Sequence, residues 1–227
     1  MMDVIRIDKK IAQDIVIKNH YLHRKASCCI AFGAYVDEEL IGVCMFGIPA
    51  SPSVCIGLCG QKEKGRVLEL TRLWIDDKIQ NYPESTLISK SLKLLRQSEY
   101  KDKDIIISYA DSEQQHLGVI YQATNWIYLG MSDKHIQYRV EGLSGHSRHY
   151  FDEFGGIEKA KVILGDKMIA YERPRKYRYL YINTKCRIRR REILSEQRYA
   201  VQSYPKHILH RNFNIDIIEI YDALKVE

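Results

Sequence analysis

The chain has 227 residues, of which 45% are hydrophobic and 28% are charged, and its formal net charge is +6 at pH 7. These values are typical of a folded globular protein and exclude a disordered chain. No stretch approaches the roughly 18 consecutive apolar residues of a membrane-spanning helix, and the first residues lack the basic and apolar segments of an export signal. We therefore expect a cytoplasmic protein with no membrane partner.

Hydrophobic periodicity divides the first two thirds of the chain into strands and helices. The expected order is strand, helix, three strands, helix, strand, helix and two closing strands. Strands are expected at residues 4–7, 30–36, 40–47, 66–75, 104–109, 126–130 and 135–140, and helices at 7–19, from about 83, and at 116–124. This order resembles that of the GNAT acyltransferases and predicts a mixed α/β fold with a central mixed sheet.

The last third of the chain has a less regular pattern and a strongly basic composition. The elements expected there are a helix at 147–154, a strand at 177–182, a basic helix at about 187–197 and a tail from residue 213. We therefore expect a catalytic domain at residues 1–142 and a basic C-terminal extension at residues 143–227 that packs on the same domain.

The six cysteines lie mostly within apolar runs and lack the regular spacing of a disulfide framework. Cys55 and Cys59 are spaced more widely than a zinc knuckle, and no second pair follows them. This pattern indicates buried free thiols in a reducing compartment.

The strongest candidates for chemistry lie at the end of the expected central strand. Asp111 closes the run Ser108–Asp111, and Tyr121 follows ten residues later across one expected helix. Side chains at the carboxyl ends of central strands face the crevice where ligands bind in open α/β sheets. Asp111 suits a catalytic carboxylate or a helix N-cap, two compatible roles. Tyr121 suits a catalytic hydroxyl or a core residue.

A second candidate pair, His20 and Tyr21, lies at the end of the first expected helix. A histidine has a pKa suited to proton transfer near neutral pH and can bind a metal ion, and the neighbouring tyrosine supplies a hydroxyl. The helix dipole alone also favours a histidine in this place.

Several segments together resemble the Mom family of bacteriophage DNA-modification proteins. They are His20-Tyr21, Leu68–Leu73, Ser108–Asp111 and Ile120–Trp126, with the later basic segments Lys176–Tyr179 and Tyr204–Lys206. The resemblance spans residues 15 to 207, and the run Tyr-Gln-Ala-Thr-Asn-Trp is its most specific part.

This resemblance implies a GNAT-like fold and the transfer of a carbamoylmethyl-type group to N6 of adenine, which protects phage DNA from host restriction. It implies that the catalytic positions are His20, Tyr21, Asp111 and Tyr121. We expect substrate or cofactor contacts from residues in the same segments, namely Arg72, Ser108, Thr124 and Asn125. Iron is associated with the family, and its ligands here would be His20 and Asp111.

The connection between the fourth strand and the next helix bears on the group donor. Ordinary GNAT enzymes bind the pyrophosphate of coenzyme A at a glycine-rich turn there, because backbone N–H groups must approach the phosphates closely. The segment Asp76–Ser85 contains no glycine and begins with two carboxylates. This departure disfavours acetyl-CoA and leaves an aminoacyl carrier such as glycyl-tRNA as the alternative donor.

The basic stretch from Arg173 onward predicts a contact with double-stranded DNA. Cations neutralise phosphates, and the interleaved tyrosines can stack on bases. The candidate DNA-binding residues are Arg173, Arg175, Lys176, Arg178, Arg187, Arg189, Arg190 and Arg191. The alternative interpretation is a solvated helix and a tyrosine-rich strand that faces the core.

Two rival functions remain open at this level. One is a GNAT N-acetyltransferase that acts on a small amine or a protein. The other is a DNA-binding protein without catalytic activity. The sequence leaves the oligomeric state open.

Overall fold

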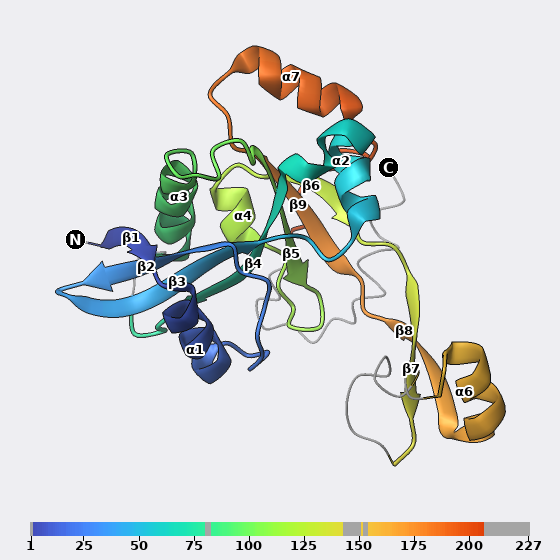
Figure 1. Cartoon of the computed structure of the whole chain (residues 1–227). Helices are drawn as coiled ribbons and strands as arrows, with labels where there is room; N and C mark the ends of the chain where they lie inside the picture. The colour runs from blue at the N-terminus through green and yellow to red at the C-terminus, as the bar shows by residue number, and fades with distance from the viewer. Residues whose placement is uncertain (1, 80–82, 143–150, 152–153, 207–227) are drawn as a thin grey trace, which may run out of the picture.

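The computed structural model describes residues 2–79, 83–142, 151 and 154–206. Its centre is a seven-stranded sheet in the order β1-β2-β3-β4-β5-β9-β6, and a separate two-stranded sheet contains β7 and β8 (Figure 1). The strands are β1 (Asp3–Ile7), β2 (Ile30–Val36), β3 (Glu39–Gly47), β4 (Val67–Ile75), β5 (Ile105–Asp111), β6 (Ile127–Met131), β7 (His135–Val140), β8 (Met168–Arg173) and β9 (Lys176–Ile182). The neighbours β4 and β5 are parallel, whereas the other paired strands are antiparallel. The prediction of a mixed α/β fold with a central mixed sheet is confirmed.

The helices that the structure describes are α1 (Lys9–Asn19), α2 (Pro52–Glu63), α3 (Pro83–Leu95), α4 (Val119–Ala123), α6 (Ile157–Leu164) and α7 (Arg187–Glu196), with short 3-10 turns at Lys64–Arg66 and Gly165–Lys167. Five of these helices cover the two faces of the large sheet, and the other one, α6, lies beside the two-stranded sheet (Figure 1). On one face, Leu87 and Ile88 of α3 and Tyr121 of α4 share a core with Trp126. On the other face, α2 and α7 cover a second core, and α1 covers a third over β2 and β3.

The helix α2 is the main element that the sequence analysis missed. Pro52 occupies its first turn, and the Ser51 hydroxyl accepts the Val54 N–H at 3.5 Å, which are ordinary signals for a helix start. The backbone leaves helical geometry at Cys59 and Gly60. This kink and the glycine-rich composition hide the helical period.

The strand β9 lies inside the sheet, next to the edge strand β6, although it comes from the basic last third of the chain. It pairs with β5 on one side and β6 on the other, so that Leu180 faces both Ile107 and Ile127. Tyr179 and Leu180 are fully buried on opposite faces. The expectation that 135–140 would close this sheet is corrected, because β7 pairs with β8 instead.

The strands β4 and β5 separate along their length. Their parallel pairing covers only three positions and ends where Glu69 lies opposite Ile107. Beyond that point β4 continues to Ile75 and β5 to Asp111. This separation opens a wedge at the carboxyl ends of two central strands, the place where ligands bind in such sheets.

Other expectations have mixed outcomes. The cysteines of the described residues are free, with Cys44, Cys55 and Cys59 buried and Cys186 exposed. None of the described helices combines the length and apolar composition needed to cross a membrane. The helix expected at 147–154 falls mostly outside the described residues, as does the tail from 213.

Candidate functional site

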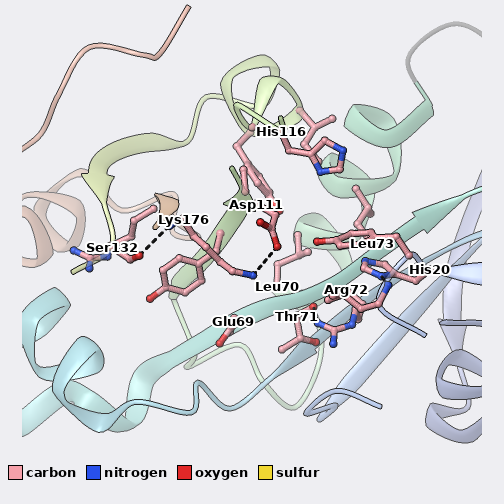
Figure 2. A pocket seen from close by; sticks show the side chains of 18 of the residues that line it. His20, Glu69, Leu70, Thr71, Arg72, Leu73, Asp111, His116, Ser132 and Lys176 are labelled. Atoms are coloured by element: carbon pink, nitrogen blue, oxygen red, sulfur yellow. Dashed lines mark hydrogen bonds and ion pairs between the residues drawn. The ribbon is translucent and has the colours of Figure 1, made fainter. Parts of the chain in front are cut away.

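A cavity of about 890 Å³ occupies the wedge between β4 and β5 (Figure 2). Its wall combines the end of α1, the second half of β4, the end of β5, the segment before α4 and the start of β9. The residues that line it include His20, Tyr21, Glu69, Arg72, Asp111, His116, Gly118, Tyr121, Arg173, Lys176 and Arg178. Segments that are far apart in the sequence therefore meet at one site.

The four expected catalytic residues all line this cavity. Asp111 forms an ion pair with Lys176 at 2.9 Å and accepts the backbone N–H of Glu113 at 3.1 Å. Burial alone would raise the pKa of Asp111, but the hydrogen bond and charge of Lys176 reverse this effect and lower it. Asp111 is therefore a stable carboxylate at neutral pH and a weak base.

Tyr21 connects Asp111 to His20. Its hydroxyl is close enough to Asp111 for that carboxylate to act on its pKa, and its ring stacks on the His20 ring at a centroid distance of 4.3 Å. Burial, followed by the charge of Asp111, raises the pKa of the Tyr21 hydroxyl. The ring of His116 meets Tyr21 edge-on at 6.0 Å. The phenol therefore remains protonated and fixed beside the carboxylate.

The geometry around His20 fixes its protonation state. Burial, followed by the nearby charge of Arg72, lowers the pKa of His20 to about 4, so the ring is neutral near pH 7. The backbone N–H of Leu22 donates to Nδ1 at 3.2 Å. Nδ1 must then carry no proton, and the proton resides on Nε2. His20 can thus donate a hydrogen bond from Nε2 but is poorly suited to accept a proton there.

These contacts do not fit the iron site that the resemblance implied. Asp111 is already occupied by Lys176 and Glu113, and the Nε2 atom of His20 carries a proton, whereas a metal ligand needs a free lone pair. Across the described part of the chain, no group of three or more His, Cys, Asp or Glu side chains could hold a metal ion. Iron is therefore not supported among the described residues, and His20 and Asp111 as its ligands stay a prediction.

Tyr121 lies at the inner wall of the cavity and is 5% exposed. Its hydroxyl is 2.8 Å from Ser108 Oγ, which is also 3.0 Å from the Leu70 carbonyl oxygen. Because Ser108 has one proton, Tyr121 donates to Ser108 whenever Ser108 donates to Leu70. Burial raises the pKa of Tyr121 well above its usual value near 10. The phenol is therefore a protonated donor.

A glycine permits this placement of Tyr121. Gly118 precedes α4 with a φ of 74°, in the left-handed region that favours glycine. A Cβ atom there would collide with the ring of Tyr179 and lie 3.0 Å from Tyr121 Cδ2. The helix expected from residue 116 therefore begins only at Val119, and its first turn packs tightly over β9.

Glu69 is a functional candidate that the sequence analysis did not select. Its side chain lies in the cavity wall near Lys176, at the point where β4 leaves β5 (Figure 2). Burial raises the pKa of Glu69 to about 7, although Arg72 and Lys176 both act to lower it. A single carboxylate within the apolar run Val67–Leu70 was the available signal.

The expected binding residues have different positions. Arg72 lines the cavity, and its buried Nε has no hydrogen-bond partner among the residues that the structure describes. Ser108 lies behind Tyr121. Thr124 donates to the Ile120 carbonyl oxygen and ends α4, and Asn125 is an exposed turn residue with a φ of 60°. The cavity wall includes neither Thr124 nor Asn125, which shape the turn after α4.

The expected DNA-binding residues divide into two groups. Arg173, Lys176 and Arg178 line the cavity, whereas the arginines of α7 do not. Arg178 is 2% exposed and stacks on Tyr199 at 3.9 Å, so it is part of the interior. Arg175 donates from Nε to the Ser132 carbonyl oxygen at 2.6 Å.

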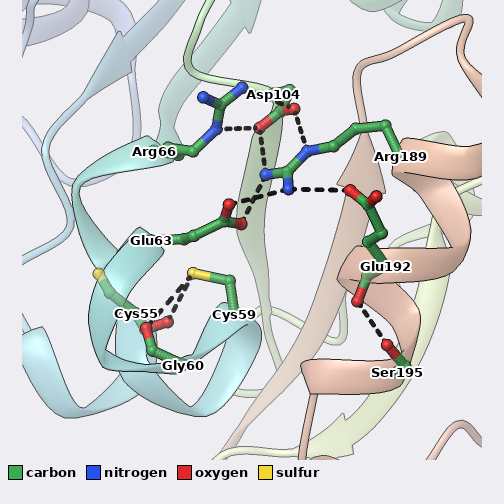
Figure 3. Close-up of polar contacts among 9 residues, drawn as sticks. All are labelled: Cys55, Cys59, Gly60, Glu63, Arg66, Asp104, Arg189, Glu192 and Ser195. Atoms are coloured by element: carbon green, nitrogen blue, oxygen red, sulfur yellow. Dashed lines mark hydrogen bonds and ion pairs between the residues drawn. The ribbon is translucent and has the colours of Figure 1, made fainter.

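Arg189 holds α7 against the body of the protein (Figure 3). Its guanidinium binds Glu63 of α2 at 2.6 Å and Asp104 at 2.9 Å, and Asp104 also binds Arg66 at 3.0 Å. The hydrogen bonds to Glu63 and then Asp104 raise the pKa of Arg189. This arginine is engaged within the fold and does not present a free charge to phosphate, in contrast to its expected role.

Comparisons with known proteins agree with the motifs that meet at the cavity. The chain is 27% identical over 199 residues to Methylcarbamoylase mom of Escherichia phage Mu. The matched segment covers 86% of this chain and 80% of that protein.

Solved structures are more distant. An N-acetyltransferase from Staphylococcus aureus Mu50 has a TM-score of 0.42 and 13% identity, and covers 81% of this chain and 98% of its own. The yncA protein of Salmonella typhimurium, described as an acetyltransferase and solved with acetyl-CoA, has a TM-score of 0.45 and 11% identity, with coverage of 82% and 96%. Likeness at this level assigns neither a donor nor a substrate to this chain. The sequence, however, matches the Mom protein family over residues 1–206, and the chain belongs to that family.

Proposed function

We propose that this chain is a DNA-modifying transferase that places a carbamoylmethyl-type group on the exocyclic N6 of adenine. The observation that carries the proposal is the meeting of the family's motif segments around one cavity, with Asp111, Tyr21 and Tyr121 in its wall. The name of the phage Mu relative, a methylcarbamoylase, supports the chemistry. In a phage genome, the modified adenine would be protected from restriction.

The volume of the cavity suits a nucleobase that has left the duplex. Ligand pockets commonly enclose about 300–1,000 Å³, and this one measures about 890 Å³. Adenine N6 takes part in base pairing, so an enzyme that acts on it extrudes the base into a pocket. Cationic groups of Arg72, Arg173 and Lys176 in the wall suit the accompanying phosphates.

Glu69 is the best candidate for the general base. In the proposed first step with a glycyl carrier, N6 attacks the carbonyl carbon, the bond from that carbon to the carrier's oxygen breaks, and N6 loses a proton to the base. The N6-glycyl product contains the same atoms as the carbamoylmethyl adduct and reaches it by rearrangement. A base works best when its pKa lies near the working pH, and Glu69 has a pKa of about 7. Asp111 is held ionised by Lys176 and serves to position Tyr21.

Tyr121 is the candidate proton donor to the leaving group. Its raised pKa keeps the proton on the phenol until a stronger base approaches. If Ser108 turns its own proton from Leu70 to Tyr121, the Tyr121 proton becomes available to a ligand. The Nε2–H of His20, whose ring stacks on Tyr21, supplies a second hydrogen-bond donor in the cavity wall.

Two carboxylates in the cavity wall bear on the choice of group donor. Asp77 and Glu84 line the cavity beside the start of α3, where a GNAT enzyme binds pyrophosphate. Negative charge there repels a pyrophosphate, which favours an aminoacyl carrier such as glycyl-tRNA over acetyl-CoA. Mass spectrometry of product made with labelled acetyl-CoA or labelled glycine separates the two. Label from acetyl-CoA alone would exclude the aminoacyl donor.

Nucleoside analysis of DNA from cells that express the protein tests the function. We expect modified adenine with the wild type, and with the control variants Tyr35→Phe and Glu39→Gln, whose positions lie outside the cavity wall. Tyr121→Phe and Glu69→Gln should lose the product. Unmodified DNA with all folded proteins, together with an acetylated small amine or protein, would establish the N-acetyltransferase instead.

A further inference from the structure

The β7–β8 ribbon extends away from the central sheet and has two different faces (Figure 1). The register places the partners of each pair on the same face, and the faces alternate along the strands. On one face, Tyr138 contacts Lys161 of α6, and Val140 is buried. Helix α6 therefore lies against the part of this face around Tyr138, whereas Ile136 at the other end is 61% exposed.

The other face, which we call the open face, contains three cross-strand pairs. They are His135 with Arg173, Gln137 with Tyr171, and Arg139 with Ile169. None of these six side chains is a carboxylate. The Arg139 guanidinium lies 6.0 Å from the centre of the Tyr171 ring, and Tyr171 is 38% exposed. The open face thus combines cations with an exposed aromatic ring, a combination that suits nucleic acid.

The open face continues the wall of the cavity. Its first pair, His135 and Arg173, also lines the cavity. The base of the ribbon is fixed to the main sheet, because Ser132 N–H donates to the Lys176 carbonyl oxygen at 2.7 Å and Lys176 N–H donates to Ser132 Oγ at 2.9 Å. Lys176 holds Asp111 through its side chain. A polymer on the open face would therefore lie directly beside the proposed catalytic groups.

We propose that the open face of the β7–β8 ribbon docks in the major groove of the duplex that carries the target adenine. The inference rests on the proposed function and adds the surface that holds the substrate. The major groove of B-DNA is about 12 Å wide and admits a two-stranded β ribbon. Six residues of strand span about 20 Å, long enough to follow the groove on one side of the target.

The chemistry of the target selects this groove. Before the base leaves the duplex, adenine N6 lies at the major-groove edge of its base pair, so a ribbon in this groove contacts the edge that identifies the target. Double-stranded RNA is excluded as the preferred partner, because its major groove is deep and too narrow for side chains to read. Charge complementarity comes from Arg139 and Arg173.

Fluorescence anisotropy with a labelled DNA duplex tests the proposal on the full chain. The variant Arg139→Glu reverses a charge on the open face, and the matched control Lys159→Glu makes the same change on α6, which lies against the other face. Arg139→Glu should weaken binding roughly tenfold and reduce the log–log salt slope by about one. Lys159→Glu should bind like the wild type. Arg139→Lys, which retains the charge, should bind with most of the wild-type affinity. Circular dichroism of Arg139→Glu checks that its weaker binding does not come from unfolding.

Three results would overturn the inference. They are equal affinities for Arg139→Glu and Lys159→Glu, tighter binding to a double-stranded RNA of the same length, and unchanged binding to a duplex whose major groove is filled by glucosylated hydroxymethylcytosine. The catalytic proposal is tested separately by nucleoside analysis. Wild-type protein that binds through the open face but leaves adenine unmodified would refute the function and retain the docking surface. An Arg139→Glu variant that modifies adenine and binds DNA with wild-type affinity would support the function and refute the docking surface.

Discussion

Replacing Arg189 with glutamine should destabilise the protein without acting directly on the cavity. Arg189 joins α7 to Glu63 of α2 and to Asp104 just before β5. The side chain of Asp104 is 6% exposed and that of Glu63 is 36% exposed. Glutamine keeps part of the length of arginine but removes the charge and the bidentate geometry.

The magnitude follows from these exposures. A charge-assisted hydrogen bond to a buried group contributes about 1.5–3 kcal/mol, and an exposed ion pair contributes up to about 1 kcal/mol. Arg66 still pairs with Asp104 in the variant, so the carboxylate is not left alone. We therefore expect a loss of about 3 kcal/mol in the free energy of unfolding. For a chain of this size, that corresponds to a decrease in Tm of about 6–12 °C.

Thermal unfolding of the wild type, Arg189→Gln and Arg191→Gln measures this effect. The control is Arg191→Gln, which removes the same charge from an exposed position of α7 and should change stability by less than about 0.5 kcal/mol. Below both transitions, the two variants should bind duplex DNA equally well. A Tm for Arg189→Gln equal to that of Arg191→Gln, or a selective loss of DNA binding, would refute the structural role of this arginine.

Three further predictions concern the cavity. The pKa of Glu69 is about 7 in the folded protein, whereas an ordinary glutamate has a pKa of 4.5. Between these two pH values the folded state retains a proton that the unfolded state loses. The free energy of unfolding therefore falls as the pH rises from about 4.5 to about 7. Urea titrations should show that Glu69→Gln removes up to about 3 kcal/mol of this loss, and an unchanged pH dependence would contradict the assignment. Gly118→Ala should cost roughly 1–3 kcal/mol and reduce modification, because its Cβ meets Tyr179 and Tyr121; a Tm equal to wild type would argue against it. Asp111→Asn should fold normally but lower the modification rate on the order of a hundredfold through loss of positioning, as measured by nucleoside analysis with purified protein, and full activity would remove Asp111 from the mechanism.

The local elements of the fold were predictable because their signals lie within short windows. The hairpin of β2 and β3, the helix start at Pro83 and the strand β5 follow from apolar runs, turn residues and capping. The position of β9 was not predictable in this way. Its alternation of cations and tyrosines resembles a surface, but Arg178 and Tyr179 are buried because β5 and β6 bind the strand from both sides. Such pairing depends on contacts far apart in the sequence.

The same distinction applies to the site. Asp111 and Tyr121 could be selected because one ends a central strand and the other belongs to a specific motif. The partner of Asp111 could not, since Lys176 reaches it from β9, 65 positions away. Lys176 was expected at DNA for its charge alone. Glu69 required knowledge of its burial, because a carboxylate in a strand usually faces solvent.

The insertion of β9 between β5 and β6 has a consequence for how the protein folds during synthesis. A nascent chain that ends before residue 176 contains Tyr121 and Asp111 but leaves β5 and β6 unpaired along the edges that β9 joins. It also lacks the lysine that holds the Asp111 carboxylate. The pairing of strands in the large sheet can therefore be completed only after most of the polypeptide has left the ribosome. We therefore expect fragments that end before residue 176 to lack modification activity.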